Sequence, residues 1–321
     1  MRTLTLRAVS SLLVFFLSLP LAAAIAPQDL LNAGRVDDAI ETLNNRVSAN
    51  PHDAQSLHLL CRAYFQYDDW DRAEGPCKRA AELEPNNSPY HRWLGRIYGE
   101  MAARASIFRA PSLAGKARDE FQRAAQLDPK DTIASVDVAE YYIEAPSFMG
   151  GGKDRARAQA KVVAKLSQAH EHWVYARIAE KDKDYATAER EYKQMIADGN
   201  SDGEAWLNLG FFYRNQKRYD DMEKAFVTMN QEPITTREVL FEAASTLYRT
   251  GRAFSFAQQL LRRYLAEGPV EEAPAFKAHN LLGLILEKQG DKAGAAAEYR
   301  AALALARNYR QAQEGLKRVA P

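Results

Sequence analysis

Neither sign of charge predominates in this chain, which has 43 Lys and Arg residues against 42 Asp and Glu. The formal net charge is therefore only +1. A near-neutral protein has no whole-surface field that would attract nucleic acid or anionic lipid, although a local charged patch is compatible with this balance. The composition argues against nucleic acid as a partner.

Long hydrophobic runs are also scarce. Residues 8–21 form the longest apolar stretch, which is shorter than the roughly 20 residues that span a bilayer. Arg2 and Arg7 precede this stretch and three alanines follow it at 22–24, a pattern typical of a secretory signal peptide. We expect cleavage after Ala24 and export to the periplasm or the medium. The mature chain would have a formal charge of −1 and no membrane span.

Motifs for catalysis or metal binding are lacking as well. The chain has no Gly-x-Ser-x-Gly element and no His-Glu-x-x-His element. The cluster His170-Glu171-His172 places its two histidines two residues apart, so on a helix they point in different directions. We therefore expect no enzyme activity, no cofactor and no metal site.

The chain does contain a repeat of about 34 residues. Ala39 and Ala73 are separated by this interval, as are Pro51 and Pro85. The clearest copy consists of Trp206, Leu209, Gly210, Tyr213, Tyr219 and Phe226, followed by Pro233. Eight copies fit, near 25–51, 54–85, 88–129, 132–168, 169–200, 203–234, 238–269 and 276–307.

This signature resembles the tetratricopeptide repeat (TPR) family, and more loosely the exported bacterial members of that family whose role is unassigned. The resemblance covers residues 25–308. It implies an all-α fold, a right-handed superhelical solenoid of about eight helix-turn-helix repeats, with residues 309–321 as a C-terminal capping helix. Since each helix pair stacks on its neighbours, we expect one elongated domain.

The resemblance implies a non-catalytic scaffold that binds a peptide or partner protein through its concave groove or its loops. The alternative is a structural or chaperone-like accessory subunit of a bacterial envelope assembly or secretion machine. Arg62, Arg92 and Arg96 dominate the first half of the groove, and guanidinium forks bind carboxylates in bidentate fashion. This favours an acidic or C-terminal carboxylate peptide. The full set of candidate groove residues is Arg62, Arg92, Arg96, Trp173, Arg177, Phe211 and Arg214.

Two alternatives to this groove site remain open. Glu100, Glu140 and Glu144 would neutralise the arginines if the face is an ordinary solvated one. Trp173, in turn, would not reach the groove if it is the core tryptophan of its repeat.

Two consecutive repeats are longer than the others, by ten and five residues. The additions fall at the turn inside each helix pair and are alike, with Ala-Pro-Ser at 110–112 and again at 145–147. Because such turns emerge on one edge of a solenoid, we expect the two inserted loops to lie side by side and to form a binding edge. The alternative is that their apolar residues pack against one another. The candidate edge residues are Phe108, Leu113, Phe148 and Met149.

The two cysteines, Cys61 and Cys77, fall on the two helices of one repeat. Packed helix axes about 8 to 10 Å apart bring facing Cα atoms into the range of a disulfide. Export to an oxidising compartment would allow the bond to form. The alternative is that both thiols are free and buried in the core.

Overall fold

The computed structural model describes residues 25–199 and 202–319. The predicted signal peptide lies outside these residues. All regular structure in the described part is helical, with seventeen α-helices and one short 3-10 helix, so the predicted all-α helical solenoid is confirmed. None of the described helices combines the length and apolarity needed to cross a membrane.

The helices form pairs in chain order, beginning with α1 and α2 and ending with α15 and α16, and α17 follows the last pair. Their bounds are α1 Pro27–Asn32, α2 Val36–Ala49, α3 Ala54–Gln66, α4 Trp70–Leu83, α5 Ser88–Arg104, α6 Ala110–Leu127, α7 Thr132–Glu144, η1 Ser147–Met149, α8 Lys153–Val163, α9 Gln168–Asp182, α10 Tyr185–Asp198, α11 Gly203–Asn215, α12 Tyr219–Gln231, α13 Glu238–Thr250, α14 Phe254–Glu267, α15 Ala275–Lys288, α16 Lys292–Leu305 and α17 Arg310–Val319.

In each of two repeats, the glycine on the first helix packs directly against an aromatic ring on the second helix. A Cβ atom added to Gly283 would lie 2.6 Å from Cε1 of Tyr299, and one added to Gly210 would overlap the ring of Phe226. Only glycine at these positions lets the two helices of a pair approach so closely.

The two long repeats use their extra residues differently. In the first, α5 extends to Arg104 and α6 begins at Ala110, so residues 110–113 open a helix; the prediction of a loop there is wrong. In the second, residues 145–152 form a turn that contains η1 and two glycines with positive φ. Arg118 of α6 donates a hydrogen bond to the Met149 carbonyl at 3.5 Å. The second inserted turn therefore packs against α6, the helix that follows the first inserted segment.

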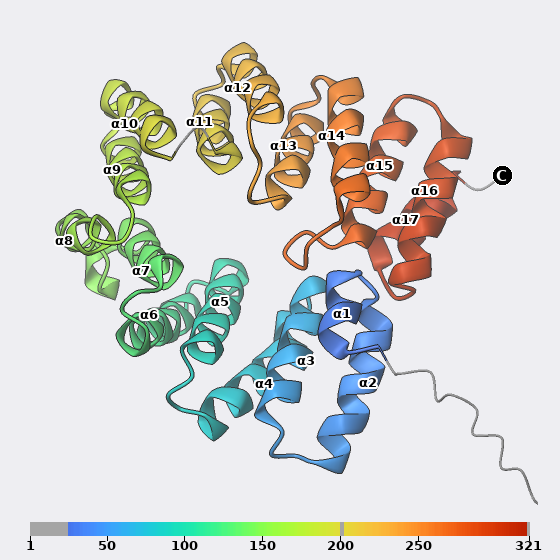
Figure 1. Ribbon diagram of the computed structural model, residues 1–321, viewed down its shortest axis with the longest axis horizontal. Coiled ribbons are helices and arrows are strands. Elements are labelled where there is room, and N and C mark those ends of the chain that lie inside the picture. Colours follow the sequence, from blue (N-terminus) through green and yellow to red (C-terminus); the bar gives the residue numbers. More distant parts are fainter. Residues whose placement is uncertain (1–24, 200–201, 320–321) are drawn as a thin grey trace, which may run out of the picture.

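The array does not extend as an open solenoid but curves until its two ends meet (Figure 1). Residues of α1, α2, α3 and the turn after α3 at the start of the chain contact α15 and the turns that precede α15 and α17 at its end. The prediction of an elongated domain is wrong, because it considered only stacking between neighbours and not the curvature that eight repeats accumulate. We call the contact between the two ends the seam, and the whole arrangement the ring.

The polar part of the seam is centred on Glu271, in the turn between α14 and α15. Its side chain is only 5% exposed. The Arg62 guanidinium of α3 donates two hydrogen bonds to it, with 2.7 Å between Nε and Oε1, and Gln28 donates a third at 2.9 Å. Nearby, Lys277 of α15 pairs with Asp68 at 2.7 Å. These bonds join residues about two hundred positions apart.

An apolar cluster continues the seam. The ring of Phe276, which is fully buried, lies with its centroid 5.8 Å from Tyr67 and 4.9 Å from Tyr309. Next to it the buried carboxylate of Asp37 accepts hydrogen bonds from the backbone N–H of Arg307 and from the Asn308 side chain. The ends of the chain thus share a hydrophobic core as well as ion pairs.

Helix α17 covers the last pair. Its small residues Ala312 and Gly315 are buried, whereas Glu314 and Lys317 face solvent. Arg318 donates two hydrogen bonds to Glu287 of α15, at 2.9 and 3.0 Å. The polar outer face is typical of the capping element that ends a helical array.

Candidate functional site

The inside of the ring encloses a cavity of about 1110 Å³. Its wall comes mainly from the first helices of four pairs, α5, α7, α11 and α13, which all face inward (Figure 1). The start of α6 and the inserted turn at 145–149 complete one side, and Glu272 at the seam lies on another. The cavity is therefore bordered both by the inserted segments and by the residue next to the seam carboxylate Glu271.

Acidic side chains predominate in the wall of this cavity. Only two basic residues line it, Arg92 and Arg96. The acidic residues that line it are Glu100, Asp137, Glu140, Glu144, Glu204, Glu238, Glu242 and Glu272. The interior of the ring is therefore electronegative, although the chain as a whole is near neutral.

The two arginines are already held by neighbouring residues of the wall. Arg92 donates a hydrogen bond from Nε to Asp137 at 2.7 Å. The Arg96 guanidinium lies 4.1 Å from the ring centroid of Trp93 and 4.8 Å from that of Phe65, a cation–π arrangement. Burial lowers the pKa of Arg96 from its usual value.

Four glutamates of the wall have no such partner. Glu140, Glu238, Glu242 and Glu272 form no ion pair with any described residue. Loss of solvation beside the protein wall raises the pKa of the first three, and the charge of Asp137 raises that of Glu140 further. The Glu140 side chain is open to the water of the cavity, while the surrounding ring limits how well that water solvates its charge.

The structure does not bring the seven predicted groove residues together. Arg92 and Arg96 line the cavity, but Arg62 is used in the seam. Arg177 donates a hydrogen bond to Glu144 at 2.6 Å, and Arg214 lies over the ring of Phe211 at 5.0 Å.

Trp173 and Phe211 pack against the hydrophobic core and do not line the cavity. The indole N–H of Trp173 donates to Asn208 at 3.1 Å. Trp173 therefore lies at the contact between its own repeat and the next one.

The predicted arginine-lined face is therefore replaced by an acidic cavity. The sequence pattern placed Glu140 and Glu242 on the inner face, but it did not show that Glu204, Glu238 and Glu272 converge with them. That convergence depends on the curvature of the ring. Arg62 and Arg92 were predicted to bind a ligand because helical spacing alone does not assign their partners within the protein, which are Glu271 and Asp137.

The candidate edge residues of the inserted segments fall into two classes. Leu113 is buried, and Met149 lines the cavity. Phe108 and Phe148 are instead 91% and 85% exposed, and neighbouring Ile107 is 80% exposed. Leu113 is thus part of the hydrophobic core of its own helix pair, whereas the two phenylalanines are not packed.

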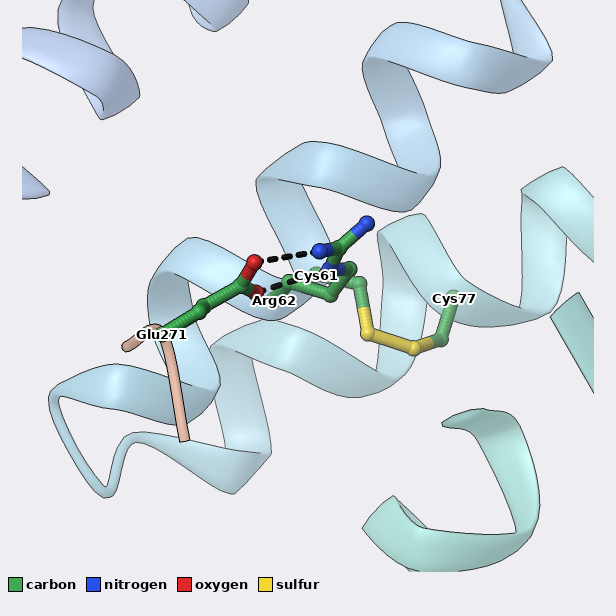
Figure 2. The surroundings of a disulfide bond; sticks show 4 residues. All are labelled: Cys61, Arg62, Cys77 and Glu271. Atoms are coloured by element: carbon green, nitrogen blue, oxygen red, sulfur yellow. Dashed lines mark hydrogen bonds and ion pairs between the residues drawn. A yellow bond between two sulfur atoms is a disulfide. The ribbon is translucent and has the colours of Figure 1, made fainter. Parts of the chain in front are cut away.

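Cys61 and Cys77 form a disulfide between α3 and α4 (Figure 2). Their Cα atoms are 5.1 Å apart, and both side chains are buried. Arg62, the residue after Cys61, points to Glu271 across the seam (Figure 2). The bond thus fixes the helix that supplies the seam arginine.

The two histidines of the cluster contact different side chains. His170 contacts the Ser167 hydroxyl at 2.8 Å, whereas His172 contacts Glu191 at 2.7 Å and Asp198 at 3.1 Å. The two rings therefore point to different neighbours, as their spacing predicts. In residues 25–199 and 202–319 no group of three or more His, Cys, Asp or Glu side chains could hold a metal ion.

Two family models, both described as tetratricopeptide repeat, match residues 30–97 and 241–312, one on each side of the seam. The chain is a tetratricopeptide repeat protein. Such proteins are generally protein–protein interaction scaffolds and typically have no catalytic activity.

Two curated TPR relatives match parts of the chain. Tetratricopeptide repeat protein 37 of Xenopus laevis is 27% identical over 214 residues, which is 64% of this chain and 13% of the relative. Superkiller complex protein 3 of Mus musculus is 29% identical over 127 residues, 40% of this chain and 8% of the relative. The chain thus spans only a small part of the length of the relatives it matches.

Among solved structures, yeast Tom70 resembles this TPR chain with a TM-score of 0.52 at 15% identity. The match covers 88% of this chain and 58% of Tom70. At this identity the likeness shows the helical-repeat fold alone.

Proposed function

We propose that the protein is an interaction scaffold that holds a basic segment of a partner protein inside the ring. The observation that carries this proposal is the excess of carboxylates in the cavity wall, among which Glu140, Glu238 and Glu242 lack a cation. A lysine or arginine side chain placed there would supply the missing charge. An extended segment a few residues long fits the cavity volume.

The wall also offers favourable contacts to such a segment. Asn208 adds a polar side chain, and Met149 and Leu207 add apolar ones. A carboxylate-bearing peptide would instead meet eight acidic residues and two arginines that are held by Asp137 or by aromatic rings. Like charges juxtaposed at an interface disfavour binding.

Export to the periplasm or the medium forms part of this proposal, supported by the pattern of Arg2, Arg7 and the apolar stretch that follows. Fractionation of the source cells, with an antibody against the mature protein, would test it. A full-length chain retained in the cytoplasm would contradict export without affecting the cavity.

The binding proposal is tested by calorimetric titration of residues 25–321 with a lysine-rich decapeptide and with its glutamate-rich counterpart. We expect binding of the basic peptide alone, weakened by salt because charge pairs carry part of the affinity. The variant Glu140→Gln/Glu238→Gln/Glu242→Gln should bind at least about tenfold more weakly, which corresponds to about 1.4 kcal/mol.

A matched control removes three carboxylates from outside the cavity: Glu41→Gln/Glu82→Gln/Glu314→Gln. These side chains are solvent-exposed and none of them lines the cavity. This variant should bind the basic peptide as the wild type does. Preferential binding of the acidic peptide, lost in Arg92→Glu/Arg96→Glu, would overturn the proposal in favour of the arginine site.

A further inference from the structure

Three large apolar side chains protrude from the inserted segments into solvent. Ile107 and Phe108 lie between α5 and α6, and Phe148 lies in η1. Their exposed fractions of 80%, 91% and 85% make them the most exposed large apolar side chains in the part of the chain that the structure describes. We call these three residues the apolar tips.

The apolar tips belong to one edge of the ring. Both segments are turns inside a helix pair, and such turns emerge on the same side of a helical array. Arg118 of α6 bonds the carbonyl of Met149 in the second turn, and Ala110 and Pro146 line the same cavity mouth. The two segments that carry the tips therefore border the same cavity, although forty residues separate Phe108 from Phe148 in the chain.

Basic residues are frequent in the two stretches that carry the tips. The stretch 101–118 contains four and the stretch 145–157 contains three. Four of these seven are neutralised by nearby carboxylates: Arg104 by Glu100, Arg118 by Asp119, and Lys153 and Arg157 by Asp182. Arg109, Lys116 and Arg155 form no ion pair with a described residue. This edge is thus locally basic, in contrast to the acidic cavity beside it.

We propose that the apolar tips and their surrounding cations dock the ring onto an anionic lipid surface. Large apolar side chains enter the interfacial region of a bilayer, and flanking Lys and Arg side chains bind anionic headgroups. Protruding side chains suit a deformable lipid layer, which needs no complementary pocket. The basic rim favours a negatively charged surface over an uncharged one.

Docking of this kind is independent of the basic segment proposed for the cavity. The tips are exposed to solvent and do not line the cavity, whereas the carboxylates do. A lipid surface at this edge would leave the other mouth of the ring accessible to a protein segment.

Vesicle co-sedimentation with residues 25–321 tests the proposal. The probes are vesicles of pure phosphatidylcholine and vesicles containing a third phosphatidylglycerol, each at low and at high salt. We expect binding to the anionic vesicles only, reduced by salt. Phe108→Ser/Phe148→Ser should lose at least about tenfold in affinity, and Arg109→Gln/Lys116→Gln should lose less.

The control Tyr185→Ser/Val227→Ser replaces two moderately exposed apolar side chains of other repeats and should bind as the wild type does. Circular dichroism should show the same helix content in all variants, because the substituted side chains make few contacts. No binding of the wild type to anionic vesicles would overturn the proposal and leave a protein as the occupant of this edge. Equal binding to both vesicle types, or unchanged binding of the Phe108→Ser/Phe148→Ser variant, would overturn it too.

Discussion

The seam and the cavity are both built from arginines and carboxylates, but they use these groups in opposite ways. At the seam two carboxylates are paired: Arg62 and Gln28 bind Glu271, and Lys277 binds Asp68. In the cavity wall, carboxylates outnumber basic residues by eight to two. Paired charges hold the ring closed, and the uncompensated ones are available to a partner.

The largest effect on stability should come from removing the seam arginine, Arg62. Arg62→Ala leaves the buried Glu271 carboxylate without its charge partner, which should lower the free energy of unfolding by about 3 to 5 kcal/mol. Urea denaturation followed by circular dichroism measures it. Arg104→Ala, which breaks the solvent-exposed pair with Glu100, is the control and should cost less than about 1 kcal/mol. Similar losses in both variants would show that the seam is no more than a surface contact.

Removal of the disulfide beside Arg62 should cause the second-largest loss of stability. Cys61→Ala/Cys77→Ala removes a bridge across a sequence separation of 16 residues, which should lower stability by about 3 kcal/mol. Thermal denaturation with and without reductant measures it: reductant should destabilise the wild type and leave the variant unchanged. A wild type insensitive to complete reduction of the bond would show that the bridge does not support this helix pair.

Removing carboxylates from the cavity should leave stability nearly unchanged, in contrast to removing the seam arginine Arg62. In Glu140→Gln/Glu242→Gln the lost charges have no ion-pair partner, so stability should fall by no more than about 0.5 kcal/mol or should rise. The same urea experiment measures this, alongside titration with the basic peptide, whose binding should weaken. A loss as large as that of Arg62→Ala would assign these glutamates to the structure of the ring and not to a partner.

The pH dependence of the unfolding free energy should be the smallest of these effects. The pKa values of Glu140, Glu238 and Glu242 are raised in the folded protein, so the native state holds protons that the unfolded state has released. Their contribution to stability is therefore fully present below the ordinary glutamate pKa of about 4.5 and is lost as the pH rises through the folded values.

The difference in unfolding free energy between the wild type and Glu140→Gln/Glu238→Gln/Glu242→Gln, measured from pH 4 to pH 8, isolates this contribution. The wild type should lose stability relative to the variant as pH rises. A relative gain would mean that the three glutamates have cation partners in solution.

The sequence predicts those features that depend on neighbouring helices. The spacing of Trp206, Gly210 and Phe226 predicts the helix pair because a glycine must face an aromatic ring, as Gly210 does. Cys61 and Cys77 are close enough to bridge because they belong to one pair.

What the sequence does not predict depends on many repeats at once. Small rotations between pairs add up, and their sum decides whether Glu271 reaches Arg62. The same sum decides whether Glu140 and Glu238, about a hundred residues apart, face one cavity. Helical spacing identifies the inner face of each helix, but it does not show which inner faces converge.

Closure of the ring is tested most directly by cross-linking across the seam. Asp68 and Lys277 form a contact between the two ends of the chain, with 2.7 Å between their side-chain atoms. In Asp68→Cys/Lys277→Cys, with the buried Cys61–Cys77 disulfide intact, a short bismaleimide should join the two new thiols within one molecule in high yield, as seen by mass spectrometry of proteolytic fragments. Each single cysteine variant serves as a control for cross-links between molecules. Modification of both thiols without an intramolecular link would contradict the closed ring, and with it the enclosed acidic cavity.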